Sequence, residues 1–251
     1  MGRVGALLRA LSSAEPDGAT TTQIAQAAGI ARPTAHRLLT ALLKEDLTDR
    51  NTTTGEWHLG PECFLLGAAA RNRYDVSDVA VDIVRRLARQ SGESAFLSVR
   101  RGDETVCLIR EDGSFPIRSH VLHEGIRFPL GVASAGMAVL ACLPEREQED
   151  YINRSDLVAT FGAMHTRAEL RGRIIETRNF GYAVNPGLID PGSWGLGAAV
   201  FDARGFPQWA FTLTGIEARI APPRQEALGK LLLHEAHALT RRMNDRAYRP
   251  D

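Results

Sequence analysis

Residues 20–43 read TTTQIAQAAGIARPTAHRLLTALL. Apolar residues recur in this stretch at helical spacing, first over about 22–28 and again over about 32–44. Gly29 separates the two segments, and Pro33 stands near the start of the second, where its missing N–H is no loss to a helix. Two short helices joined by a glycine turn predict a helix-turn-helix unit.

The two faces of this unit predict its core and its contact surface. Small Ala25 permits a close crossing of the helices. The inward side is apolar and consists of Ile24, Ala28, Ile30, Ala35 and Leu38. The second helix keeps a polar side free, whose arginines can contact phosphates and base edges in a DNA major groove. The residues that we expect to contact DNA are Thr22, Gln23, Arg32, Pro33, Thr34, His36, Arg37 and Arg50.

The flanking sequence extends the unit over residues 1–60. Before it, the spacing predicts a helix with an apolar face made of Val4, Leu7, Leu8 and Leu11. After it, the polar tip 51–55 lies between two short candidate strands, which is typical of the wing in a winged helix. Pairs of short helices also occur in purely structural bundles, and the wing favours DNA binding over that alternative.

The charges of residues 1–60 cancel, with six Lys or Arg and six Asp or Glu. Within residues 31–44, however, three cations and no acid are gathered on the candidate recognition helix. A neutral module gains useful affinity by presenting two copies to DNA, so we expect a homodimer. The apolar face of residues 4–11 is the candidate dimer surface.

The whole chain has the composition of a soluble globular protein, with 251 residues, 44% apolar and 24% charged. Lys+Arg and Asp+Glu number 30 each, so any DNA binding has to be local. Three widely spaced cysteines among apolar neighbours predict reduced core cysteines. The sequence contains no recognisable secretory signal or membrane span, which predicts a cytoplasmic protein with no membrane partner.

A linker helix is expected over residues 61–74 and a second domain over residues 75–251. In this domain helices alternate with hairpins rather than with single strands, which predicts an α+β fold with an antiparallel sheet packed between helices. The expected strands cover 94–100, 104–110, 117–121, 182–184, 196–201 and 208–213. The expected helices cover 75–90, 134–143, a segment from 145, the segment between the capping box at 166–169 and Gly181, and 222–243.

With this order of elements the chain resembles the IclR family of bacterial transcription regulators over essentially its full length. Three stretches carry the resemblance: residues 20–43, residues 128–138 (FPLGVASAGMA), and Gly181-Tyr182 leading through Asn185 to residues 198–202 (AAVFD). The resemblance implies an N-terminal winged helix-turn-helix, a linker helix and an effector-binding α/β domain, acting as dimers or tetramers on promoter DNA.

The resemblance also implies an effector pocket. Carried over position by position, it falls on Ile117, His120, Phe128, Ser134, Ala135, Asn185, Ser193, Gly195, Thr212 and Thr214. Ser134 and Ala135 open a predicted helix, whose positive end suits a carboxylate, and the two threonines share one face of a strand. A small organic acid or aromatic effector is therefore expected. The plainer alternative is that Ser134 caps its helix and the threonines only fill a strand.

One position departs from the family pattern. Members often place an acid where Asn185 stands, so hydrogen bonding there differs and the class of ligand is left open. Nearby, Gly195-Leu196-Gly197 precedes a strand and lacks a third glycine, which indicates strand packing rather than a dinucleotide loop.

Patterns for catalysis and metal binding are incomplete. The G-x-S-x-G sequence of a nucleophile elbow is not met around Ser134, and the histidine pairs 120/123 and 234/237 lack further ligands at a suitable spacing. We therefore expect no catalysis, no cofactor and no metal. The alternative function is an enzyme or metabolite-binding protein that uses the winged helix for association, with Ser134, His120 and Asn185 as candidate catalytic groups.

Overall fold

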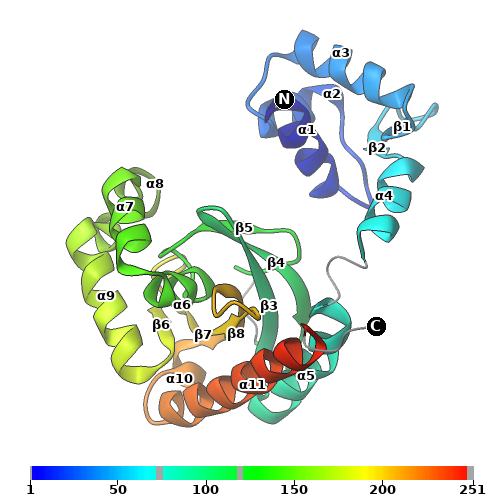
Figure 1. Cartoon of the computed structure of the whole chain (residues 1–251). Helices are drawn as coiled ribbons and strands as arrows, with labels where there is room; N and C mark the ends of the chain where they lie inside the picture. Colours follow the sequence, from blue (N-terminus) through cyan, green and yellow to red (C-terminus); the bar gives the residue numbers. More distant parts are fainter. Residues whose placement is uncertain (1, 72–75, 118–120, 248–251) are drawn as a thin grey trace. The chain divides into compact units, whose positions relative to one another are not determined.

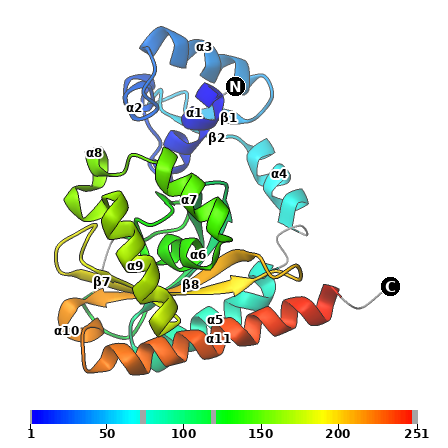
Figure 2. The same cartoon turned by 60° about the vertical axis from the view of Figure 1, so that its left-hand side comes forward.

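The computed structural model describes residues 2–71, 76–117 and 121–247, and the chain divides into two compact units, 1–75 and 76–251. Figure 1 and, turned by 60°, Figure 2 show the course of the chain through both units. The first unit contains α1 (Gly2–Ser12), α2 (Thr21–Ala27), α3 (Arg32–Leu43), β1 (Thr48–Arg50), β2 (Trp57–Leu59) and α4 (Pro61–Arg71).

The first unit folds around a small apolar core. Leu7 and Leu11 of α1 are fully buried against residues from α2, α3 and β2, so this face of α1 stabilises the unit. Leu7 and Leu11 are therefore not available to a dimer surface, and this part of the expectation for residues 4–11 is wrong. In α3, Leu39 rather than Leu38 is fully buried, a shift of one position around the helix.

The wing is a short antiparallel ladder in which Arg50 lies opposite Trp57. Trp57 also exchanges two backbone hydrogen bonds with Ala19, which lies in the loop between α1 and α2. At the wing tip, the Asn51 side chain accepts hydrogen bonds from the N–H groups of Thr53 and Thr54. The wing is thus closed at its tip and tied to the loop at its base.

The second unit is a six-stranded sheet of order β5-β4-β3-β8-β7-β6 whose neighbours are all antiparallel. The predicted α+β class, with an antiparallel sheet packed between helices, is confirmed. Its elements are α5 (Val76–Ser91), β3 (Ser94–Arg101), β4 (Glu104–Glu111), β5 (Arg127–Pro129), α6 (Ser134–Cys142), α7 (Glu145–Arg154), α8 (Val158–Phe161), the 3-10 helix η2 (Ala163–His165), α9 (Arg167–Phe180), β6 (Ala183–Pro186), β7 (Ser193–Phe201), β8 (Pro207–Ile216), α10 (Glu217–Ile220) and α11 (Arg224–Ala247).

Alternation along β8 divides the core into two layers. Phe211 and Leu213 face α5 and α11, whereas Ala210 packs into the cluster that α6 and α9 form on the other face. Figures 1 and 2 show α5 and α11 side by side across one face of the sheet. Thr212 and Thr214 have the same parity as Ala210, so they belong to the face that α6 covers.

Several local predictions require correction. The third strand lies at Arg127–Pro129, where it pairs with β4, whereas Ile117 and Val121 at the ends of the expected 117–121 strand are in bends. The capping box expected at 166–169 is half formed: Thr166 accepts from the Glu169 N–H, but the Thr166 N–H donates to the Ala163 carbonyl instead. All three cysteines are free, yet Cys142 is exposed rather than in the core.

Candidate DNA-contacting face and effector pocket

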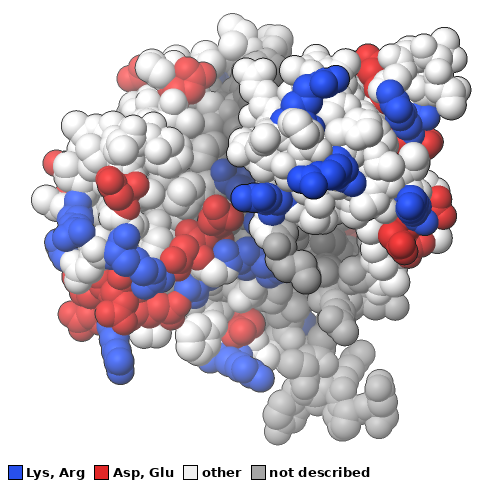
Figure 3. Space-filling model, turned by 90° about the horizontal axis from the view of Figure 1, so that it is seen from above, with Lys and Arg blue, Asp and Glu red and all other residues white. Residues whose placement is uncertain are grey.

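The candidate recognition helix α3 presents an open polar side. Arg32, Pro33, His36 and Arg37 are exposed, and Thr34 is half-buried. The residue that precedes the helix, Ala31, has no side-chain oxygen to cap it, so the first N–H groups and the positive end of the helix stay available to a phosphate. Figure 3 looks onto this unit from above and shows Lys and Arg side chains on the face that carries α3, with Asp and Glu toward its edge.

The other predicted DNA contacts lie in α2 and in the wing. Thr22 and Arg50 are exposed. Gln23 is engaged in a capping box: its Oε1 accepts from the Thr20 N–H at 2.8 Å and from the Thr20 hydroxyl at 2.7 Å. We infer that Gln23 fixes the start of α2, whether or not its amide group also reaches DNA.

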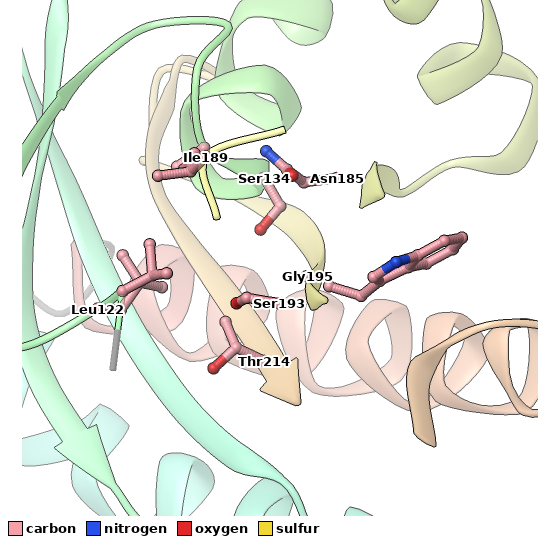
Figure 4. Close-up of a pocket in the computed structure, with 10 residues that line it drawn as sticks. Leu122, Ser134, Asn185, Ile189, Ser193, Gly195 and Thr214 are labelled. Atoms are coloured by element: carbon pink, nitrogen blue, oxygen red, sulfur yellow. The ribbon is translucent and has the colours of Figure 1, made fainter. Parts of the chain in front are cut away.

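The second unit contains a small pocket, with a cavity volume of about 20 Å³, between the start of α6 and strands β7 and β8. Five of the predicted effector residues line it: Ser134, Asn185, Ser193, Gly195 and Thr214. In Figure 4 the hydroxyl groups of Ser134, Ser193 and Thr214 face one common space, and Leu122 and Ile189 lie on its other side. The structure thus brings these five predicted residues together on the polar wall of one pocket.

Four other predicted residues are not among those that line this pocket. Ile117 is 58% exposed, and Phe128 packs against the ring of Phe161 with centroids 6.5 Å apart. Ala135 and Thr212 are buried beside the pocket without lining it. His120 lies outside the described residues. Sequence reasoning missed the apolar wall, which comes from Val121, Leu122, Ala133, Ile189 and Trp194.

The start of α6 is uncapped by any side chain. The N-cap residue is Ala133, and Ser134 is the first helical residue, so the alternative that Ser134 merely caps its helix is wrong. The first-turn N–H groups have no acceptor within the helix. An anionic oxygen placed in the pocket beside Ser134 would meet these donors and the positive end of the helix dipole.

Two glycines of β7 let the α6 terminus approach the sheet. A Cβ at Gly197 would lie 2.5 Å from the Ser134 carbonyl oxygen, and a Cβ at Gly195 would lie 3.0 Å from the Ser134 hydroxyl. β7 can therefore carry no side chain at positions 195 and 197 while Ser134 keeps this position. The interpretation of Gly195-Leu196-Gly197 as a packing feature agrees with this geometry.

Buried threonine hydroxyls lie next to the helix start. Thr212 and Thr214 are 0% and 6% exposed, and neither hydroxyl has a hydrogen-bond partner in the part of the chain that the structure describes. A buried polar group without a partner costs about 1–3 kcal/mol. Since Thr214 lines the pocket, a ligand oxygen there would satisfy its hydroxyl.

Both polar atoms of the Asn185 side chain form hydrogen bonds with the protein backbone. Its Nδ2 donates to the Val132 carbonyl at 2.8 Å, and its Oδ1 accepts from the Leu188 N–H at 2.9 Å. These bonds join the turn before α6 to the turn that carries Ile189. None of the ten described lining residues is charged. Among the residues described, no group of three or more His, Cys, Asp or Glu is placed to hold a metal ion.

A second buried polar pair lies between η2 and α9. The His165 Nδ1 lies 2.9 Å from the Phe161 carbonyl oxygen, and Arg173 donates to the Met164 carbonyl at 3.2 Å. Over the described ranges, the His165 Nε2 and the Arg173 Nε have no hydrogen-bond partner. Burial, and then the charge of Arg173, lower the pKa of His165 below its ordinary value of 6.5. This histidine is therefore neutral in the folded protein at neutral pH.

This pKa shift makes stability depend on pH. The unfolded chain takes up a proton on His165 near pH 6.5, whereas the folded protein does so only at lower pH. We therefore expect the free energy of unfolding to fall as pH drops below 6.5, by at most about 1.4 kcal/mol per pH unit from this group. Urea unfolding of the parent and of His165→Gln between about pH 7.5 and about pH 5.5 measures it. The variant should show the shallower decline, and exposed His234→Gln should match the parent; equal declines in all three proteins would contradict the assignment.

A winged helix-turn-helix unit, together with a second unit that holds a pocket with a polar and an apolar wall, defines a ligand-responsive transcription regulator. The two parts match known families separately: residues 2–51 match the family described as "IclR helix-turn-helix domain", and residues 68–241 match "Bacterial transcriptional regulator IclR C-terminal". The chain belongs to the IclR family of bacterial transcriptional regulators. In the described residues, no helix has the length and apolar character needed to cross a membrane.

Individual proteins of the family resemble the chain over nearly its whole length. The HTH-type transcriptional regulator BhcR of Paracoccus denitrificans is 28% identical over 244 residues, covering 95% of this chain and 87% of its own. An IclR-type regulator of Alicyclobacillus acidocaldarius has a solved structure that superposes with a TM-score of 0.80 at 24% identity, covering 96% and 97% of the two chains. An IclR homologue of Microbacterium hydrocarbonoxydans, solved with 4-hydroxybenzoate, shares the fold at 20% identity and a TM-score of 0.75, covering 97% and 98%.

Proposed function

We propose that this regulator binds promoter DNA through α3 and the wing and responds to a small organic carboxylate held at the start of α6. One observation carries the ligand proposal: an uncapped, buried helix start faces a threonine hydroxyl that has no partner among the described residues. Such a terminus is stabilised by an anion that accepts from its N–H groups. The DNA-contacting residues are those named above, with Arg32 and Arg37 carrying most of the contact.

The pocket chemistry favours an acid of modest size. Its polar wall offers donors from Ser134, Thr214 and the α6 backbone, and its opposite wall is apolar, with Leu122 and Ile189. The cavity volume is only about 20 Å³, so a compact aliphatic acid or a single aromatic ring has to displace side chains of the apolar wall to enter. The 4-hydroxybenzoate bound by the Microbacterium homologue supports this class and supplies a probe.

We also propose that the regulator works as a homo-oligomer, dimer or tetramer, on symmetric operators. The neutral charge of residues 1–60 supports this, since one copy offers few cations to the phosphates. With α1 packed into the core, the candidate contact surface moves to α4, where Phe64, Leu65 and Leu66 are all more than half exposed. Duplexes selected by the protein from a randomised pool should then contain two half-sites at multiples of about 34–36 Å.

The geometry gives little support to the alternative of an enzyme. The described lining of the pocket has no histidine or carboxylate that would activate the Ser134 hydroxyl. Asn185, a candidate catalytic group under that alternative, has both ends of its amide bonded to backbone. We propose regulation without catalysis, and without a cofactor or metal.

The Thr214→Val variant tests the carboxylate site. Valine keeps the volume and removes the unpartnered hydroxyl, so the free protein should be as stable as the parent or more stable, by about 1 kcal/mol. Binding of 4-hydroxybenzoate and of a panel of smaller carboxylates, measured by calorimetry, should weaken about 5- to 10-fold through loss of one hydrogen bond. An acid that weakens operator binding tenfold must also bind the DNA complex tenfold more weakly, as linkage requires, which is about 1.4 kcal/mol.

Thr212→Val is the matched control, because its hydroxyl is equally unpartnered among the described residues but does not line the pocket. It should stabilise the protein without changing the affinity for the acid. Parental affinity in Thr214→Val would place the carboxylate elsewhere. If no carboxylate of the panel bound the parent, the proposed ligand class would be wrong.

A further inference from the structure

Trp57 lies where three parts of the winged helix meet. Its side chain is 1% exposed, in the core that α1, α2 and α3 build. Its indole Nε1–H donates to the Thr21 hydroxyl at 3.0 Å, which ties the wing to the first residue of α2. Its backbone pairs with Ala19 just before that helix. Trp57 therefore fixes the base of the wing against the first half of the helix-turn-helix.

The same ring contacts two of the predicted DNA-contacting side chains. Arg50, its cross-strand partner, places its guanidinium carbon 5.2 Å from the ring centroid. The Arg50 Nε also donates to the Gly55 carbonyl at the wing tip, at 3.3 Å. From the recognition helix, the His36 ring meets the indole edge-on, with centroids 6.5 Å apart and planes at 88°. One buried ring thus contacts a side chain of the wing and a side chain of α3.

We propose that Trp57 is a positioning residue for DNA binding, which holds Arg50 of the wing and His36 of α3 in a fixed arrangement for the phosphate backbone. The inference rests on the proposed DNA contacts of these two residues. Trp57 itself is buried and has no direct part in the contact.

The physical reason is preorganisation. An exposed arginine samples many rotamers and loses that freedom when it binds a phosphate. Stacking on an indole and bonding to the Gly55 carbonyl restrict Arg50 before DNA arrives, while the planar group keeps other N–H donors for the ligand. Because the ring is anchored through Thr21, the position of Arg50 is set relative to α2 and α3 rather than only to the wing.

A double-variant cycle tests the proposal with Arg50→Ala, Trp57→Phe and the combined protein, on a mixed-sequence duplex of about three helical turns. Phenylalanine keeps an apolar ring but loses the indole N–H and much of the surface under the guanidinium. We expect each single variant to weaken binding by about 2- to 5-fold, and Arg50→Ala to have almost no further effect in the Trp57→Phe background. Both single variants should flatten the dependence of log affinity on log salt by up to about 0.9, the contribution of one phosphate contact.

Two further variants separate positioning from a general effect on folding. Thr21→Val removes the acceptor of the indole N–H without touching the ring, and should shift binding in the same direction as Trp57→Phe. Ile24→Val shortens another buried residue of the same core, and should lower stability while leaving the salt dependence at the parental value.

The outcomes discriminate between the claims. If Arg50→Ala costs the same factor with and without Trp57, or if Ile24→Val flattens the salt dependence equally, Trp57 is only a core residue and the inference is overturned. If the parent protein does not bind the duplex at low salt, the proposed DNA-binding function is wrong, and the role of Trp57 falls with it. If Trp57→Phe does not fold by circular dichroism, Thr21→Val combined with Arg50→Ala gives the same cycle.

Discussion

An Arg32→Ala, Arg37→Ala double variant should lose most of its operator affinity, by about 2–6 kcal/mol if each arginine supplies about 1–3 kcal/mol. Both side chains project from the exposed side of α3, and Arg32 is the first residue of this helix, whose start no side chain caps. An arginine that reads a base relaxes selectivity at one base pair when it is removed. An arginine on a phosphate weakens all sequences alike and flattens the salt dependence. Titration of selected duplexes at two salt concentrations measures both effects.

The matched control is an Arg85→Ala, Arg171→Ala protein, which loses the same charge from exposed positions of the second unit. It should bind the operator within about twofold of the parent, because the change in net charge acts only through a screened field. Parental affinity in the Arg32, Arg37 double variant, or an equal loss in the control, would show that α3 does not carry the recognition surface.

Gly197→Ala should strongly destabilise the second unit. The new Cβ would lie 2.5 Å from the Ser134 carbonyl oxygen and 2.7 Å from its carbon, and both atoms are backbone, which has no rotamer to yield. Either α6 moves off the sheet or β7 distorts. We expect a loss of about 2–3 kcal/mol, seen as a thermal midpoint lower by roughly 5–10 °C, and weaker acid binding because Ser134 is displaced.

Gly172→Ala provides the comparison. Gly172 is exposed on α9, and a Cβ there meets nothing within 4 Å, so alanine should stabilise the protein by about 0.5–1 kcal/mol through helix propensity alone. Calorimetric melting of the two variants beside the parent is sufficient. A Gly197→Ala protein that melts with the parent and binds the acid normally would mean that the α6 terminus does not rest on the sheet as described.

The winged helix could be read from sequence because its signals are local. Gly29, Pro33 and the wing tip at 51–55 each act on their own few residues. Helix-period spacing was accurate enough to place α2 and α3 within a residue or two and to put Leu38 on the apolar side, where it packs against the core, but it left out the fully buried Leu39. A one-residue step rotates a helix by about 100°, so the rim of an apolar face is the part that spacing alone resolves least well.

The lining of the pocket could be predicted from the sequence only in part. Its polar wall could be carried over from the family resemblance because Ser134 and Asn185 lie in stretches that carry the resemblance. Leu122 and Ile189 come from turns without a repeating pattern, and only the tertiary fold brings them opposite Thr214. The hydrogen bonds of Asn185 to Val132 and Leu188 could not be predicted either, because the sequence shows a polar side chain but not the groups with which it forms hydrogen bonds.

The bare stretch of β7 under α6 limits how this protein can acquire a new ligand preference. Positions 195 and 197 admit almost no side chain without moving Ser134, so the wall of the pocket that is proposed to bind the carboxylate tolerates little variation there. Leu122 and Ile189 lie outside the helices and strands, although Leu122 also packs against Phe96 and Cys107 of the sheet. Directed evolution toward larger or more polar acids should therefore select substitutions at loop positions such as these, while the groups proposed to bind the carboxylate stay unchanged.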